Sequence, residues 1–202
     1  MSAFKRVFAI VFVAFSLGAC SAYDPATRNA QVDVAGFQSA TPSFDVTELR
    51  IQVPQELSVS EANTIYPIAD IVWRGDPRGN RHKQVLDIFA ASIQAGTDTL
   101  EGVQPVAVDI EVTKFHSLTE RARYTVGGVH TIRFLLTVRD AQSGGALISE
   151  RLVNADLMAF GGQAALNAEA MGQSQKVRIS EHLTALIVEE LSRPLSEPSA
   201  IF

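Results

Sequence analysis

The sequence predicts an α+β fold, in which a mainly antiparallel sheet of four to five strands carries two amphipathic helices on one face. Apolar and polar residues alternate with period two at 106–112 and 132–138, which is typical of half-buried strands, and a third strand is expected at 146–156. Apolar residues recur every three to four positions at 81–95 and 179–191, which indicates helices with one buried face. Packing both helices on one face of the sheet buries the two sets of apolar residues together.

Two further extended segments precede the first helix. Residues 49–53 alternate between apolar and polar side chains, and Pro54 closes this strand. Residues 65–73 form another apolar stretch, but Pro67 cannot donate a ladder hydrogen bond and indicates a sheet edge. The segment 140–145 is rich in Gly and Ser, so the strands that flank it are expected to form an antiparallel hairpin.

The helix boundaries carry their own signals. Asn80 is a plausible N-cap for the first helix and Gly96 a plausible stop. The last helix is expected to end before Pro194. Residues 163–171 also favour a helix, but Gly172 leaves open whether it continues into the last one.

The N-terminus has the pattern of a secretory signal. Lys5 and Arg6 precede an apolar run at 7–17, which is shorter than the roughly 20 residues that a membrane-spanning helix needs. The following Leu17-Gly18-Ala19-Cys20 resembles the lipobox of bacterial lipoproteins. That resemblance implies cleavage before Cys20, attachment of lipid to its sulfur and acylation of the new amino group. Several acyl chains together anchor a protein stably in a membrane.

Three parts of the chain follow from this pattern. We expect a lipoprotein signal peptide at 1–19, a lipidated N-terminus with a flexible tether at 20–44, and a single α+β domain at 45–202. Alternatively, part of the tether packs on the domain as an irregular arm. The expected location is the bacterial cell envelope, facing the periplasm. Ser21 follows the cysteine and favours the outer over the inner membrane by the sorting rule of enteric bacteria.

Charge and cysteine content limit the partners. The formal charge is -5, and loss of Lys5 and Arg6 with the signal makes the mature chain more acidic, which does not favour nucleic acid. Contact with the membrane is therefore expected through the lipid on Cys20. Cys20 is the only cysteine, so the chain has neither an internal disulfide nor a cysteine-based metal site. No cofactor is expected.

Residues 73–77 read Trp-Arg-Gly-Asp-Pro and predict a tight turn before the first helix. An adhesion role for Arg-Gly-Asp would need a eukaryotic receptor, which the lipobox disfavours. Either the turn is purely structural, or Arg74 and Asp76, with Arg78 and Arg81, form a polar recognition rim.

The 117–129 connection is long for a hairpin, and such loops are often functional or mobile. Arg121, Arg123 and Tyr124 could bind a carboxylate, a phosphate or a sugar there; the alternative is a flexible, solvated loop. His116 and His130 flank the loop and could lie opposite each other. Two imidazoles are too few for a zinc site, so no metal site is expected.

Catalytic motifs are missing from the sequence. It has no G-x-S-x-G elbow and no H-E-x-x-H pattern. Its paired glycines lack the spacing of phosphate-binding loops. We therefore expect no enzyme activity.

Several motifs resemble an uncharacterised family of alphaproteobacterial envelope lipoproteins: the lipobox, Ile71-Val72-Trp73-Arg74-Gly75-Asp76-Pro77, Arg123-Tyr124-Thr125-Val126-Gly127-Gly128 and Phe160-Gly161-Gly162. The resemblance covers most of the mature chain and implies no activity. The order of helices and strands is more distantly similar to small envelope accessory lipoproteins, such as the lipopolysaccharide-assembly plug and the auxiliary lipoproteins of lipid-transport systems.

Three functions remain open at this point. The leading one is a non-catalytic, membrane-anchored interaction or accessory module with a protein partner in envelope assembly or transport. The alternative is a periplasmic-side carrier of a hydrophobic ligand or glycan, with its site between helix and sheet. A further alternative is an enzyme of unknown class.

Overall fold

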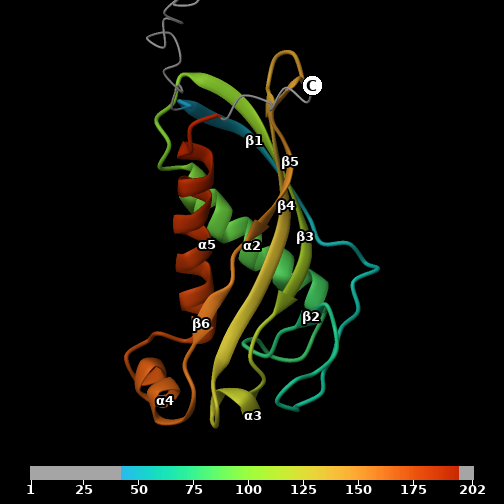
Figure 1. Cartoon of the computed structure of the whole chain (residues 1–202), viewed down its shortest axis with the longest axis vertical. Coiled ribbons are helices and arrows are strands. Elements are labelled where there is room, and N and C mark those ends of the chain that lie inside the picture. The colour runs from blue at the N-terminus through green and yellow to red at the C-terminus, as the bar shows by residue number, and fades with distance from the viewer. Residues whose placement is uncertain (1–41, 196–202) are drawn as a thin grey trace, which may run out of the picture. The chain divides into compact units, whose positions relative to one another are not determined.

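The computed structural model describes residues 42–195; the predicted signal peptide, Cys20 and nearly all of the predicted tether lie outside the described residues. With the labels of Figure 1, the elements in chain order are β1 (Phe44–Gln52), β2 (Ile71–Val72), α2 (Arg81–Thr97), β3 (Gln104–His116), α3 (Glu120–Arg123), β4 (Gly128–Asp140), β5 (Ala146–Asn154), β6 (Leu157–Ala159), α4 (Gly162–Ala170) and α5 (Gln175–Ser192). The predicted α+β class is confirmed.

Four long strands form the sheet in the order β1-β3-β4-β5. β1 runs parallel to β3, whereas β4 pairs antiparallel with both β3 and β5. The short strand β2 pairs in parallel with the end of β3, and β6 pairs with the start of β4. The sheet is mixed but mostly antiparallel, and the predicted hairpin around 140–145 is confirmed.

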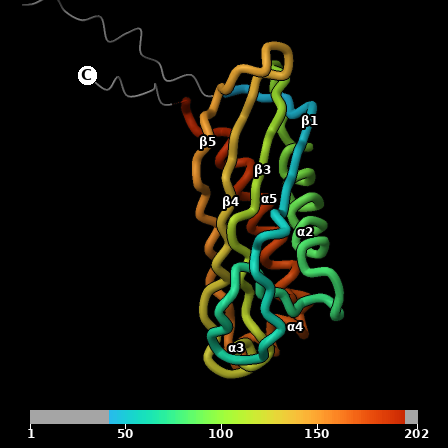
Figure 2. Tube along the Cα trace, turned by 90° about the vertical axis from the view of Figure 1, so that its right-hand side faces the viewer, coloured from blue at the N-terminus to red at the C-terminus, as the bar shows by residue number. Residues whose placement is uncertain are grey.

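The helices α2 and α5 cover one face of the sheet (Figures 1 and 2). Their predicted apolar stripes are confirmed, because Val85, Phe89 and Ile93 of α2 and Ile179, Leu183 and Ile187 of α5 are fully buried. Between helix and sheet, Phe89 packs edge-to-face on Phe115 and Phe134, with ring centroids 6.1 and 5.6 Å away. Trp73 extends this aromatic group by packing on Phe115. Large apolar side chains therefore fill the space between the two layers.

Gly96 lies where α2 and α5 approach each other closely. A Cβ atom at this position would lie 2.4 Å from Cγ2 of Ile187 and 2.7 Å from the carbonyl oxygen of Thr184. The prediction that Gly96 stops the helix is wrong, because α2 continues to Thr97. The glycine is needed for the helix crossing. The predicted N-cap is confirmed, since the Asn80 side chain accepts a hydrogen bond from the amide of Lys83.

The extended segment predicted at 65–73 is wrong for most of its length, since only Ile71–Val72 is a strand. Just ahead of β2, Asp70 is joined to Ser58 by its side chain as well as by its backbone. The carboxylate of Asp70 accepts hydrogen bonds from the backbone N–H and the hydroxyl of Ser58, at 2.9 and 2.6 Å. Pro67 cannot donate a backbone hydrogen bond, so the segment cannot continue the ladder through this position.

The C-terminal region contains two separate helices, α4 and α5. Gly172 has a φ of +79°, a left-handed conformation that ends α4. The side chain of Ser174 then caps α5 by accepting a hydrogen bond from the amide of Val177.

The described domain has two distinct ends (Figure 1). The start of β1, the turn between β4 and β5 and the end of α5 lie at one end. The short elements α3, β6 and α4 lie at the other, which we call the distal end. The described chain enters the domain at Phe44, at the end opposite the distal one. Within residues 42–195, no helix is long and apolar enough to cross a membrane.

Candidate functional site

The turn that contains Arg74 and Asp76 is fixed from two sides. Nε1 of the fully buried Trp73 donates a hydrogen bond to Oδ2 of Asp76 at 2.8 Å. Nζ of Lys176, in the first turn of α5, lies 2.7 Å from the other carboxylate oxygen. Burial raises the pKa of Asp76, but hydrogen bonds from Lys176 and Trp73 more than offset this, and the pKa lies below its ordinary value. Both carboxylate oxygens of Asp76 therefore have partners within the domain.

Glu61 binds both Arg74 and Arg81. Nε of Arg81, whose side chain is almost fully buried, lies 2.6 Å from Oε1 of Glu61. Nη1 of Arg74 donates to the carbonyl oxygen of Glu61 at 2.8 Å and lies 3.3 Å from its Oε2. The hydrogen bond from Arg81 is the main reason why the pKa of Glu61 is lowered. No periodic pattern marks Glu61, because it lies in the irregular segment between β1 and β2.

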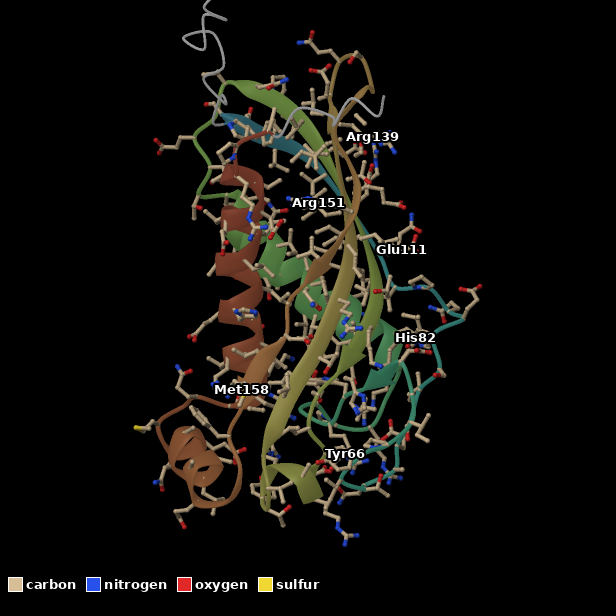
Figure 3. All side chains as sticks on the ribbon, viewed as in Figure 1. Tyr66, His82, Glu111, Arg139, Arg151 and Met158 are labelled. Atoms are coloured by element: carbon tan, nitrogen blue, oxygen red, sulfur yellow. The ribbon has the colours of Figure 1, made fainter. Side chains whose placement is uncertain are left out.

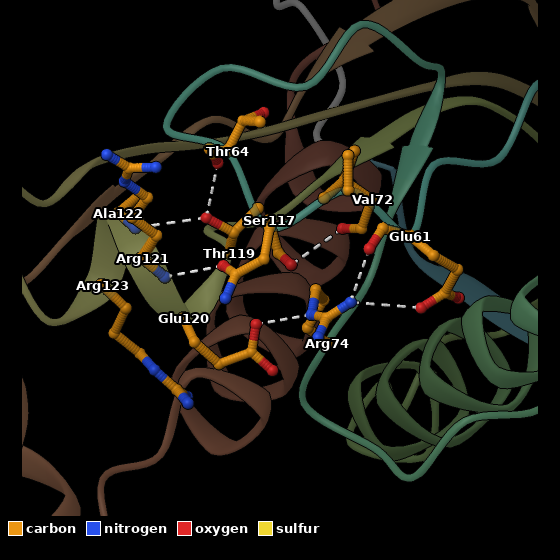
Figure 4. Close-up of polar contacts among 12 residues, drawn as sticks. Glu61, Thr64, Val72, Arg74, Ser117, Thr119, Glu120, Arg121, Ala122 and Arg123 are labelled. Atoms are coloured by element: carbon orange, nitrogen blue, oxygen red, sulfur yellow. Dashed lines mark hydrogen bonds and ion pairs between the residues drawn. The ribbon is translucent and has the colours of Figure 1, made fainter.

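The predicted 117–129 loop is an ordered turn that contains α3 (Figure 4). The hydroxyl of Ser117 donates to the carbonyl oxygen of Val72 at 2.8 Å. The hydroxyl of Thr119 donates to the carbonyl oxygen of Thr64 at 2.7 Å and also caps α3. These bonds fasten α3 to two other segments, so the freely solvated loop is not what the structure shows.

Arg123, Tyr124 and Glu169 form a second polar group, which joins α3 to α4. Nη1 of Arg123 lies 3.0 Å from Oε1 of Glu169, and the Tyr124 hydroxyl donates to Oε2 of Glu169 at 3.3 Å. The Arg123 guanidinium also lies over the Tyr124 ring, 4.7 Å from its centroid. Two of the predicted binding residues therefore hold the end of α4 in place.

The structure brings most of the predicted residues to the distal end. Arg74 reaches α3 through a hydrogen bond from its Nε to Glu120 (Figure 4). Burial raises the pKa of Glu120, but this hydrogen bond and the charges of Arg74 and Arg123 hold it below its ordinary value. Arg121 differs, because its side chain is exposed while its backbone N–H donates to Asn63. Arg74, Asp76 and Arg123 each form an ion pair within the domain. They do not line one shared open pocket.

The two histidines do not face each other. His116 pairs with Thr131 across the β3–β4 ladder. Because successive side chains of a strand point to opposite faces, His130 points to the face opposite that of His116. Within residues 42–195, no three His, Asp or Glu side chains are close enough to hold a metal ion.

A small polar cavity lies beside Arg123, and its polar lining consists of Arg123, His130, Glu169, Gln173, Gln175 and Arg178. It encloses about 10 Å³, which is room for about one water molecule. His130 and Gln175 are more than nine-tenths buried. Burial, aided by the charges of Arg178 and Arg123, lowers the pKa of His130 to about 4, so its ring is neutral at pH 7. The sequence singled out Arg123 and His130, but it gave no signal for Glu169, Gln173, Gln175 or Arg178.

A groove of about 600 Å³ runs along the outer side of α2 and α5. Small side chains line it, chiefly Ala91, Ala95 and Ala185, with Val188 at one end. The groove lies on the surface of the helix layer. It is therefore distinct from the space between helices and sheet, which the core fills.

Exposed apolar side chains are numerous at the distal end. Val129 of β4 and Met158 of β6 are cross-strand neighbours, and Met158 is 70% exposed. Other exposed side chains there belong to Tyr124, Val126, Phe160, Leu166 and Met171. Figure 3 shows Met158 beside β6 and Tyr66, which is 84% exposed, near α3. We call Val126, Val129, Met158, Phe160, Leu166 and Met171 the distal apolar surface.

Solved structures with a distant likeness to this chain include the following two. The protein XCC0632 from Xanthomonas campestris, of the family model DUF330, is 12% identical, with a TM-score of 0.46 over 77% of this chain and 87% of that one. A "putative lipoprotein" from Caulobacter crescentus CB15 is 11% identical, with a TM-score of 0.34 over 55% of this chain and 83% of that one. No curated protein matches the sequence. A family model described as a family of unknown function, DUF6778, matches residues 44–202, and the chain belongs to this family.

Proposed function

We propose that this chain is a lipid-anchored bacterial lipoprotein that acts as a non-catalytic interaction module in envelope assembly or transport. The lipid on Cys20 holds it at a membrane, with the outer membrane favoured, and its partner is another envelope protein. The lipobox and the short apolar run before it support the anchor.

The distal apolar surface is the observation that carries the proposal. Side chains such as Met158, Phe160 and Met171 stand well exposed at the end away from Phe44, where the chain enters the domain. Clustered exposed apolar side chains on a soluble domain commonly mark an interaction site.

The composition of the distal apolar surface favours a protein partner over a second contact with the bilayer. Protein interfaces are enriched in aromatic residues, Met and Arg. Here Phe160 lies under the guanidinium of Arg178, 4.0 Å from ring centroid to Cζ, and Met158 is its near neighbour in sequence. An anionic bilayer would instead attract an excess of Lys and Arg, whereas the chain is acidic overall.

Co-purification after crosslinking in intact cells tests this proposal. Met158→Asp places a charge in the distal apolar surface and is expected to lower recovery of the crosslinked partner at least tenfold. The matched control is Leu152→Asp, since Leu152 is a similarly exposed apolar side chain on β5, 59% exposed. Equal recovery with both variants, or no partner for the unmodified chain, would contradict the proposal.

The anchor is tested separately. Cys20→Ser removes the sulfur that would carry the lipid. The unprocessed chain is therefore expected to accumulate, and the lipidated mature form is expected to be missing from the membrane fraction. Unchanged processing and membrane association of Cys20→Ser would contradict the lipid anchor. This result would not bear on the protein contact, which the crosslinking experiment tests.

The groove on α2 and α5 favours a second candidate, a carrier of a hydrophobic ligand or glycan. Its lining is mainly apolar and it is large enough for part of an acyl chain. Native mass spectrometry of the chain purified from its own membranes tests this role. Bound ligand that disappears with Ala91→Trp would favour the carrier over the interaction module.

A further inference from the structure

Residues around the polar cavity carry buried side-chain atoms that have no hydrogen-bond partner within residues 42–195. The donors among them are Nε of Arg123, Nε2 of His130 and the amide nitrogen of Gln175, and the acceptors are the amide oxygen of Gln175 and Oε1 of Glu169. Such groups are rare in folded proteins. Their gathering around one cavity makes it a candidate binding site.

The tautomer of His130 makes its unpartnered nitrogen a donor. Nδ1 of His130 accepts a hydrogen bond from the backbone N–H of Leu118 at 3.4 Å. Nδ1 therefore carries no proton in the neutral ring, and the proton lies on Nε2. For Nε2 of His130, which belongs to the cavity lining, the missing partner is consequently an acceptor.

The charges around the cavity favour an anionic acceptor. Arg123 and Arg178 both line it, and the facing carboxylate is that of Glu169. Nη1 of Arg123 lies 3.0 Å from Oε1 of Glu169, which forms an ion pair but no aligned hydrogen bond. One positive charge thus remains in excess, beside donors that a planar or tetrahedral oxyanion could bind.

Helix α4, which supplies Glu169, has the features of a movable cover. Glycines with positive φ stand at both of its ends, Gly162 at +55° and Gly172 at +79°. At the C-terminal end, Glu169 holds α4 to Arg123 and Tyr124. Release of this carboxylate would remove the side-chain contacts that tie the end of α4 to Arg123 and Tyr124.

We propose that the polar cavity is a binding site for a small oxyanion, a carboxylate or a phosphate ester, and that the anion displaces Glu169 from Arg123 as α4 opens. In the closed form, the carboxylate of Glu169 takes the place of the ligand on one side of Arg123. Nothing in this proposal depends on the distal protein contact, so either can fail alone.

Calorimetric titration of the full chain in detergent with inorganic phosphate and with acetate tests the site. Glu169→Gln removes the internal competitor and is expected to tighten binding of at least one anion about fivefold, since partly buried ion pairs of this kind contribute roughly 1 kcal/mol. Arg123→Gln is expected to weaken binding at least tenfold. Glu189→Gln is the matched control, because Glu189 pairs with Arg193 at the other end of α5.

Hydrogen exchange separates this role from a merely structural one. If Glu169 only stabilises the position of α4, Glu169→Gln would speed hydrogen exchange in α4 without tightening anion binding. The proposal requires that Glu169→Gln does both. Equal anion affinity of Glu169→Gln and Glu189→Gln would overturn the proposal.

A second arm identifies the source of the anion. Vesicles of phosphatidylcholine with and without phosphatidylglycerol are added to the chain in place of free anions. Tighter binding of Glu169→Gln to free phosphate or acetate supports a soluble ligand, and tighter binding only to phosphatidylglycerol vesicles supports a lipid headgroup. Failure of both sets of probes would contradict the site.

Discussion

The ammonium group of Lys176 lies 2.7 Å from the carboxylate of Asp76, which joins the first turn of α5 to a turn 100 residues earlier in the chain. The same carboxylate accepts the hydrogen bond of the buried Trp73 indole. Asp76→Ala is therefore expected to lower the free energy of unfolding by about 2 kcal/mol, because a buried N–H loses its acceptor. Urea denaturation measures the change.

Asp87→Ala is the control for this substitution. Asp87 pairs with Lys83 on the exposed side of α2, where the side chain of Asp87 is 57% exposed. Its removal is expected to have little effect. Equal destabilisation by the two variants would show that the Asp76 contacts are not specific to the buried turn.

The close crossing of α2 and α5 predicts the effect of a single methyl group. Alanine favours a helix over glycine by roughly 1 kcal/mol, so Gly96→Ala would stabilise an isolated helix. Here the added Cβ collides with Ile187 and the Thr184 backbone, and we expect a net loss of about 2 kcal/mol. Thermal unfolding compared with Gly145→Ala, in an open turn, checks this. A rise in melting temperature for Gly96→Ala would contradict the crossing.

The buried ring of His130 predicts acid sensitivity. Its pKa is about 4 in the folded chain, against an ordinary value near 6.5, so the unfolded chain binds more protons between these values. Stability is therefore fully present above pH 6.5 and falls as the pH drops towards 4, by at most about 3 kcal/mol from this residue. The burial that lowers the pKa of His116 acts in the same direction.

Urea denaturation at pH 7 and pH 5 measures this loss. His130→Gln keeps a polar side chain but removes the titrating ring, so most of the pH dependence in this window should disappear. If the variant loses as much stability as the unmodified chain between pH 7 and 5, the ring of His130 is not buried in its neutral form.

Periodic elements could be predicted from the sequence, because burial repeats along them. The alternation at 106–112 and the stripe at 81–95 became β3 and α2. The strand predicted at 65–73 forms only at Ile71–Val72, because Pro67 cannot donate a ladder hydrogen bond and Asp70 bonds to Ser58 ahead of it. The parallel pairing of β1 with β3 was not foreseen, since alternation gives the face of a strand and not its direction.

The candidate site could be predicted only in part, because its residues come from elements that lie far apart in the sequence. Arg123 and Tyr124 stood out by their types within a long connection. Their partner Glu169 comes from α4, and the cavity adds His130 and Gln175 from a strand and a helix. These residues come from β4, α4 and α5 and meet only in the folded chain, so no local pattern in the sequence predicts the cavity.

Photo-crosslinking in intact cells tests the central claim, an anchored domain that presents its distal end to a protein. A photoreactive amino acid at Met158 is expected to give a discrete adduct with another envelope protein. The same group at Leu152 on β5 should give none. Adducts of equal yield from both positions, or none from Met158, would contradict the account.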